Sequence, residues 1–448
     1  MSETMRLSDD AIRAALSLPA DLRAPADLGH DIRTAVAKTP QRRSHWLGWR
    51  PSRRQRLVLQ LAVAIALLAV AAGAALLLVG GRQAPPPPPP TTTTYHGGPA
   101  RDGVNPGPAP SGIPRIAWAT DAKGPIGSWS PVVSAGMVYA ADQNGFVTAL
   151  DEATGTKVWQ RDLGAPDNSG PTLANGLIVA GDDAGFVHAL DAATGQERWR
   201  YKALGPVHSS AIAWHDLVID ASLGGDLVAL DVATGRLVWS TATAGPVSRS
   251  IAEADGTVFT GSGGATPSTP GTLAAWDAAT GRPRWATRVD PGNTTSVTVS
   301  DGRVLVGEGL DQSTAADHHV EAFDARSGAR LWTAPFAAPT GKALLIGAAA
   351  GGSVYVTAID GNLYVLDATT GAVQWTAGIN STQSPNGAVV DGVLLIASDD
   401  RRIHAFDIAS RAPLWQVPVR GVPGPPAVVD GRLFVTTGAG QIVCLVGG

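Results

Sequence analysis

The residues with the clearest metal-binding chemistry lie in one stretch, 308–319, which reads EGLDQSTAADHH. Asp311, His318 and His319 carry carboxylate and imidazole groups, which are ordinary ligands of divalent cations. Adjacent histidines on a strand point to opposite faces, however, so one ion rarely binds both. We therefore expect a solvated loop and no metal site. Because no Ser/His/Asp triad or paired-carboxylate spacing stands out, we assign no catalytic residue.

Cysteine content and charge exclude several other kinds of site. The chain has 448 residues and one cysteine, Cys444. An intramolecular disulfide is therefore excluded, as is a zinc site built from several thiolates. The formal net charge is −4. This balance gives no electrostatic reason to expect nucleic-acid binding.

A more regular pattern involves aspartate, glycine and tryptophan. In HALDAATGQERW, Asp191 precedes Trp199 by eight residues, with Gly195 midway. Seven such copies follow one another, and their tryptophans lie 40, 40, 46, 47, 43 and 40 residues apart. A fixed period of this length indicates a repeat architecture.

The motif has a structural interpretation in every copy. We expect the aspartate to accept backbone N–H groups in a turn and the glycine to take the left-handed conformation. The turn-forming residues are Asp151, Gly155, Asp191, Gly195, Asp231, Gly235, Asp277, Gly281, Asp324, Gly328, Asp367, Gly371 and Asp407. We expect the tryptophan to lie on an outer strand and dock on the next repeat. The blade-docking residues are Trp118, Trp159, Trp199, Trp239, Trp285, Trp332, Trp375 and Trp415.

Each repeat contains four short apolar runs separated by turns, including Asn175-Gly176, a type I′ hairpin signal. Four antiparallel strands per 40-odd residues predict an all-β propeller over residues 112–448. Seven motifs supply seven outer strands. The C-terminal run provides three more strands, and the stretch around Trp118 provides a lone outer strand. We therefore predict eight four-stranded blades, the last closed by the first strand.

These motifs resemble the blade motif of the PQQ-like (quinoprotein) β-propeller family, A-x-D-x-x-T-G-x-x-x-W. The last copy departs from it, with Ser410-Arg411 in place of Thr-Gly. The resemblance implies that catalytic members hold pyrroloquinoline quinone (PQQ) near the propeller axis, with Ca²⁺, a catalytic Asp and a ring made by adjacent cysteines. This chain has no adjacent cysteines and no C-x-x-C-H haem motif. We expect no cofactor, with PQQ and Ca²⁺ as the alternative.

The N-terminal part carries a membrane signal. Residues 1–56 form a short polar segment, and 57–80 contain an uncharged apolar run. As a helix, Leu57–Val79 would span ~34 Å, enough to cross a bilayer. Seven Lys/Arg residues between positions 37 and 56 place the N-terminus in the cytoplasm by the positive-inside rule. Residues 81–111, with six consecutive prolines, read as a Pro/Thr-rich and irregular linker.

The longest insertions predict a binding face. Loops between second and third strands emerge on the same propeller face as the connections between blades. The two longest of these loops lie on adjacent blades, and we take Asp311, His318 and His319 from one of them. Arg249 and Lys342 lie in connections on that face. We expect a protein or small-molecule ligand there, because rigid scaffolds present binding residues on loops.

Three functions remain open. The favoured one is a single-pass, membrane-anchored, extracytoplasmic propeller that acts as a non-catalytic binding or scaffold module, as in the outer-membrane assembly subunit of Gram-negative bacteria. That subunit is a lipoprotein, and this chain lacks a lipidation cysteine, so its assembly role does not carry over. The second is a PQQ-dependent dehydrogenase. The third is a transmembrane signal transducer similar to membrane-bound anti-sigma proteins, with the propeller as sensor.

Overall fold

The computed structural model describes residues 91–127, 129–263, 270–291, 297–307, 318–336, 345–358, 360–381 and 386–448. The predicted cytoplasmic segment 1–56 and membrane helix 57–80 lie outside these residues, as does the first part of the linker. Within the described residues, no helix is both long enough and apolar enough to cross a membrane.

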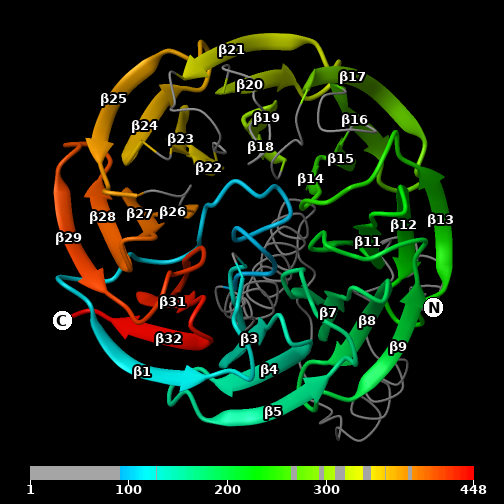
Figure 1. Ribbon diagram of the computed structural model, residues 1–448, viewed down its shortest axis with the longest axis horizontal. Coiled ribbons are helices and arrows are strands. Elements are labelled where there is room, and N and C mark those ends of the chain that lie inside the picture. The colour runs from blue at the N-terminus through cyan, green and yellow to red at the C-terminus, as the bar shows by residue number, and fades with distance from the viewer. Residues whose placement is uncertain are drawn as a thin grey trace, which may run out of the picture. The chain divides into compact units, whose positions relative to one another are not determined.

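Eight four-stranded antiparallel sheets form a closed ring (Figure 1). The predicted eight-bladed propeller is confirmed, including its closure, because β1 pairs with β32 and completes the last blade. In each blade the strands run from the innermost at the axis to the outermost at the rim.

The first four blades are continuous in sequence. Blade 1 has β2 (Val132–Ser134), β3 (Met137–Ala141), β4 (Phe146–Asp151) and β5 (Lys157–Asp162). Blade 2 has β6 (Thr172–Ala174), β7 (Leu177–Gly181), β8 (Phe186–Asp191) and β9 (Glu197–Lys202). Blade 3 has β10 (Ile212–Trp214), β11 (Leu217–Ala221), β12 (Asp226–Asp231) and β13 (Leu237–Ala242). Blade 4 has β14 (Ala252–Ala254), β15 (Thr257–Ser262), β16 (Pro270–Asp277) and β17 (Pro283–Pro291).

The other four blades repeat this order, and the eighth takes its outer strand from the start of the propeller. Blade 5 has β18 (Thr298–Ser300), β19 (Arg303–Gly307), β20 (His318–Asp324) and β21 (Arg330–Phe336). Blade 6 has β22 (Leu345–Ala350), β23 (Ser353–Thr357), β24 (Asn362–Asp367) and β25 (Val373–Gly378). Blade 7 has β26 (Asn386–Val390), β27 (Val393–Ser398), β28 (Arg402–Asp407) and β29 (Pro413–Pro418). Blade 8 has β30 (Ala427–Val429), β31 (Arg432–Thr436), β32 (Gln441–Val446) and β1 (Arg115–Asp121).

Two kinds of turn form one face of the ring, which we call the turn face. The first joins the two inner strands of a blade, as at Asn175-Gly176, where φ is 44° and 79°. The second is the Asp…Gly motif that joins the two outer strands. In it, Asp191 Oδ1 accepts Thr194 N at 2.9 Å, and Gly195 has a φ of 70°. The turns between the middle strands and the connections between blades form the opposite face, the connection face.

Six of the eight outer-strand tryptophans lie against the Asp…Gly turn of the next blade. The other two, Trp375 and Trp415, pack against apolar clusters between blades. Trp199 Nε1 donates to the Val232 carbonyl at 2.8 Å, and a Cβ on Gly235 would lie 2.6 Å from the indole. The glycine is therefore needed for the close approach of the ring as well as for its φ of 68°. Indole N–H groups make the same kind of bond from Trp118, Trp159, Trp239, Trp285 and Trp332.

Apolar side chains between adjacent blades form the core. Trp199 belongs to a cluster that joins blade 2 to blade 3, where it packs with Val187 of β8 and Leu230 of β12. Equivalent clusters lie between the other blades, because each sheet buries both faces against its neighbours. The ring is thus stabilised by contacts between neighbouring repeats.

This packing predicts the effect of removing one indole. Trp199 is 8% exposed, so Trp199→Ala should lower the free energy of unfolding by about 3–5 kcal/mol, as expected for a large core truncation. Val238→Ala is the control, because Val238 lies on the next outer strand and is 53% exposed. It should change stability by less than about 0.5 kcal/mol. Urea unfolding would measure both, and equal midpoints for wild type and Trp199→Ala would refute the docking role.

Candidate functional site

The centre of the ring is occupied by the chain itself. Residues 92–105, which we call the axial segment, follow the inner strands once around the axis in the order of the blades (Figure 1). We assigned these residues to the linker between membrane and propeller. The structure places them inside the propeller, where Thr92 and Thr94 are almost fully buried.

The axial segment pairs with the free edges of the innermost strands. In blade 2, Leu173 N donates to the Thr93 carbonyl at 2.7 Å, and in blade 6, Ala349 N donates to the Asp102 carbonyl at 2.7 Å. Backbone N–H groups of Glu253, Val299 and Val389 donate to carbonyls of the axial segment in three further blades. In blades 1 and 8, Val133 N donates to Thr92 Oγ1 and Val428 N to Asn105 Oδ1. Blade 3 contributes the Ala211 carbonyl, which lies just before β10. These bonds satisfy polar groups that a sheet edge otherwise leaves unpaired.

Arg101 anchors this segment. Its guanidinium is fully buried, and all five N–H donors meet protein oxygens. The acceptors are Thr94 Oγ1 and the carbonyls of Tyr95, Ser210, Ala211 and Ile251, at 2.5 to 3.0 Å. Burial lowers the pKa of Arg101 to about 10, an effect opposed by Tyr95 and Asp220. The side chain therefore keeps its charge at neutral pH.

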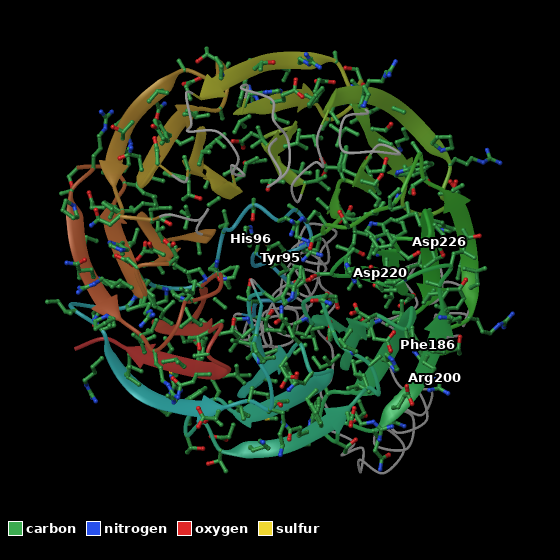
Figure 2. All side chains as sticks on the ribbon, viewed as in Figure 1. Tyr95, His96, Phe186, Arg200, Asp220 and Asp226 are labelled. Atoms are coloured by element: carbon green, nitrogen blue, oxygen red, sulfur yellow. The ribbon has the colours of Figure 1, made fainter. Side chains whose placement is uncertain are left out.

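Aromatic rings fill the axis beside this arginine. Tyr95 and His96 are 5% and 3% exposed and lie near the centre of the ring (Figure 2). Their rings stack with centroids 4.1 Å apart, and Trp129 meets Tyr95 edge-on at 5.5 Å. The backbone N–H of His96 donates to Ser130 Oγ at 3.0 Å. Ser130 lies in the connection that precedes blade 1.

A buried carboxyl group, Asp220, lies in blade 3. Asp220 occupies a position in β11 where β7 has Ala180 and β3 has Ala140. One oxygen of Asp220 accepts Ser209 Oγ and Ala221 N; the other has no hydrogen-bond partner among the described residues. Burial raises the pKa of Asp220 to about 7.

Asp167, in the connection between blades 1 and 2, is a second carboxyl group of this kind. It is fully buried, and Ser169 N donates to its Oδ1 at 2.6 Å. Its Oδ2 lacks a partner in the part of the chain that the structure describes. Burial raises its pKa well above the usual range. At the positions equivalent to Asp167 and Asp220, other repeats have apolar or small residues.

The binding face predicted from the insertions is only partly described. Arg249 is exposed in the connection between blades 3 and 4, and His318 and His319 begin β20. His319 is 7% exposed and lies 3.9 Å from the buried carboxylate of Glu321. Asp311 and Lys342 lie outside the described residues, so this site stays a prediction. Within the described ranges, no three His, Cys, Asp or Glu residues are grouped to hold a metal ion.

A cleft of about 890 Å³ opens on the turn face between blades 4 and 5. Its lining includes Asp255 and Asp301 from hairpin turns, Arg326 from an Asp…Gly turn, and Asp102 from the axial segment. Burial raises the pKa of Asp102, and Asp301 adds to that effect. Sequence reasoning did not find this cleft, because no insertion or unusual residue marks it.

Comparisons with known proteins agree on the fold. A family model described as outer membrane protein assembly factor BamB (PQQ_2) matches residues 114–253, 223–319, 316–423 and 360–447. No curated protein sequence matches the chain.

Solved structures of several kinds share the architecture. BamB from Moraxella catarrhalis superposes with a TM-score of 0.58 at 20% identity, covering 75% of this chain and 98% of its own. Quinohemoprotein alcohol dehydrogenase from Comamonas testosteroni gives 0.64 at 16% identity, covering 80% and 81%. The computationally designed protein Ika8 gives 0.60 at 15% identity, covering 73% and 100%. At these identities the likeness concerns the fold alone.

The raised pKa of Asp220 predicts a pH dependence of stability. A carboxyl whose pKa is higher in the folded than in the unfolded chain favours folding while it is protonated. That contribution is complete below its ordinary value of 3.8 and is lost as the pH rises toward about 7. Asparagine does not ionise. The stability of Asp220→Asn relative to wild type should therefore increase as the pH rises from 5 to 8.

Melting temperatures of the two proteins across that pH range would measure the effect. Asp216→Asn, in the exposed turn before β11, is the matched control and should shift little with pH. A difference between Asp220→Asn and wild type that stays constant from pH 5 to pH 8 would contradict the assignment.

Proposed function

The chain belongs to the PQQ-like β-propeller family, and we propose that it is a membrane-anchored, extracytoplasmic member that binds partners without catalysing a reaction. The membrane part of this proposal rests on the sequence. The apolar stretch Leu57–Val79 is long enough to span a bilayer, and the cations before it orient the propeller outward.

The non-catalytic part of the proposal rests on the position of the axial segment at the propeller axis. The family resemblance implies a quinone near the propeller axis in catalytic members. In this chain the axis holds Tyr95, His96 and Arg101, all buried. The five donors of Arg101 are already bound to protein oxygens, and His96 and Trp129 already contact the Tyr95 ring.

These residues do not fit a quinone at the axis. A planar ligand would have to displace the axial segment and break its bonds to the inner strands, leaving buried polar groups unpaired at about 1–3 kcal/mol each. Cys444, the only cysteine, lies in β32 and is fully buried, and a ring of adjacent cysteines needs two. Both observations favour a scaffold over a dehydrogenase.

A signal transducer is the second candidate, and one contact pattern favours it. The axial segment begins two residues after the last of the six consecutive prolines and contacts every blade. A change in the propeller that altered the axial segment would therefore act directly on the chain that leads to the membrane.

Membrane topology gives the first test of this proposal. Protease added to intact cells should remove a C-terminal tag with the propeller and spare an N-terminal tag, because the seven flanking cations hold the N-terminus inside. Immunoblots against both tags measure the result, with permeabilised cells as the control. Loss of the N-terminal tag from intact cells would refute the orientation.

Cofactor binding gives the second test. The purified full chain, mixed with PQQ and Ca²⁺, should show no alcohol- or sugar-dependent dye reduction and no change in melting temperature. A ligand present at 100 times its Kd adds roughly 2.7 kcal/mol of stability. For a domain of this size that corresponds to a rise in melting temperature of about 3–4 °C, which is measurable. Stoichiometric PQQ binding with dye reduction would overturn the non-catalytic assignment.

A further inference from the structure

The contacts of the axial segment are those of a bound peptide. Peptides that add to a sheet edge gain affinity from main-chain hydrogen bonds and specificity from side-chain pockets. Residues 92–105 make main-chain bonds of this kind, such as Glu253 N to the Pro99 carbonyl and Val389 N to the Gly103 carbonyl, both at 2.8 Å. None of these contacts is covalent.

Side-chain recognition centres on Arg101. Its pocket is formed by carbonyl oxygens of Ser210, Ala211 and Ile251, at the start of the innermost strands of blades 3 and 4. Buried Asp220 lies close enough to raise the pKa of Arg101 through its charge. Three fixed carbonyls and a nearby carboxyl suit a forked, charged donor, which arginine provides and neutral side chains do not.

Covalent attachment holds the segment at a high local concentration. Downstream of residue 105, the chain passes an exposed stretch, Ser111–Ile113, before β1 begins at Arg115. A ligand joined by so short a connection competes at an effective concentration in the millimolar range. A separate peptide can therefore enter the channel only if that connection is cut or the axial segment is pulled out of the channel.

We propose that the axial channel is a binding site for an extended, arginine-containing peptide, and that residues 92–105 occupy it as a tethered ligand that such a peptide can displace. The inference rests on the proposed non-catalytic binding role and names the class of partner. The partner is the same segment of a second copy of this chain, which presents Arg101 among small and hydroxyl-bearing residues.

The test uses the full chain with a protease recognition sequence inserted between Gly112 and Ile113, both exposed. The protein folds before cleavage, and the cut then leaves the N-terminal fragment held only by non-covalent contacts. Gel filtration after cleavage should show the two fragments eluting together. A fluorescent peptide of residues 91–108, added in excess, should then exchange into the channel and raise the anisotropy.

Variants of this peptide test whether binding depends on Arg101. The Arg101→Ala peptide should bind at least about 100-fold more weakly, because it loses several hydrogen bonds from a charged donor. Arg101→Lys keeps the charge without the fork and should also bind more weakly than wild type. Val104→Ala is the matched control, because the Val104 side chain is 41% exposed, and this peptide should bind like wild type.

Two outcomes would overturn the inference. Fragments that elute together while the wild-type peptide never exchanges would mean that the segment is a fixed part of the fold. Equal binding of the wild-type and Arg101→Ala peptides would remove the arginine pocket. Either outcome leaves the non-catalytic role standing if PQQ supports no dye reduction. PQQ binding with dye reduction would refute that role and would not itself test the peptide site.

Discussion

The unpaired edges of the innermost strands are the constraint on which this structure depends. Eight separate sheets arranged in a ring each keep two strand edges, one at the rim and one at the axis. The N–H and C=O groups there need partners, and in this chain the axial segment supplies them, from Thr92 at blade 1 to Asn105 at blade 8. Pairing of the inner edges and occupation of the centre of the ring are thus achieved by the same fourteen residues, 92–105.

At the rim, six of the eight junctions between blades pack an indole against a glycine of the next blade. The last copy of the motif forms the same turn without glycine. Arg411 takes a φ of 64° where the other copies have glycine. Its N–H still donates to the Asp407 carbonyl at 2.8 Å, as Gly371 N does to Asp367. The turn therefore forms without glycine, at the cost of a left-handed arginine.

The sequence predicts the local repeat well and the axis poorly. Strand order and blade number follow from the spacing of motifs such as Asp191…Trp199, because seven of the blades are built from contacts within about 40 residues. The closing strand follows because the C-terminal blade lacks an outer strand and the stretch around Trp118 supplies one. The axial segment bonds mainly through its backbone to strands up to 286 residues away, as from Val389 N to the Gly103 carbonyl, and such bonds leave no side-chain pattern. Asp167 and Asp220 carried a readable signal, because both place a carboxyl where other repeats have apolar or small residues. No sequence feature marks the cleft beside Asp102, because the cleft arises from the packing of the blades in three dimensions.

Amide hydrogen exchange tests the central claim most directly, because it reports whether the edge groups at the axis are paired. Exchange would be measured in the intact protein for the innermost-strand amides of Leu173, Glu253, Val299 and Ala349, which the axial segment covers. The account predicts that they are protected as strongly as amides of the second strands, such as Ile178 and Val258. Exchange as fast as in the exposed turns would contradict it, since those edges would then be open to water.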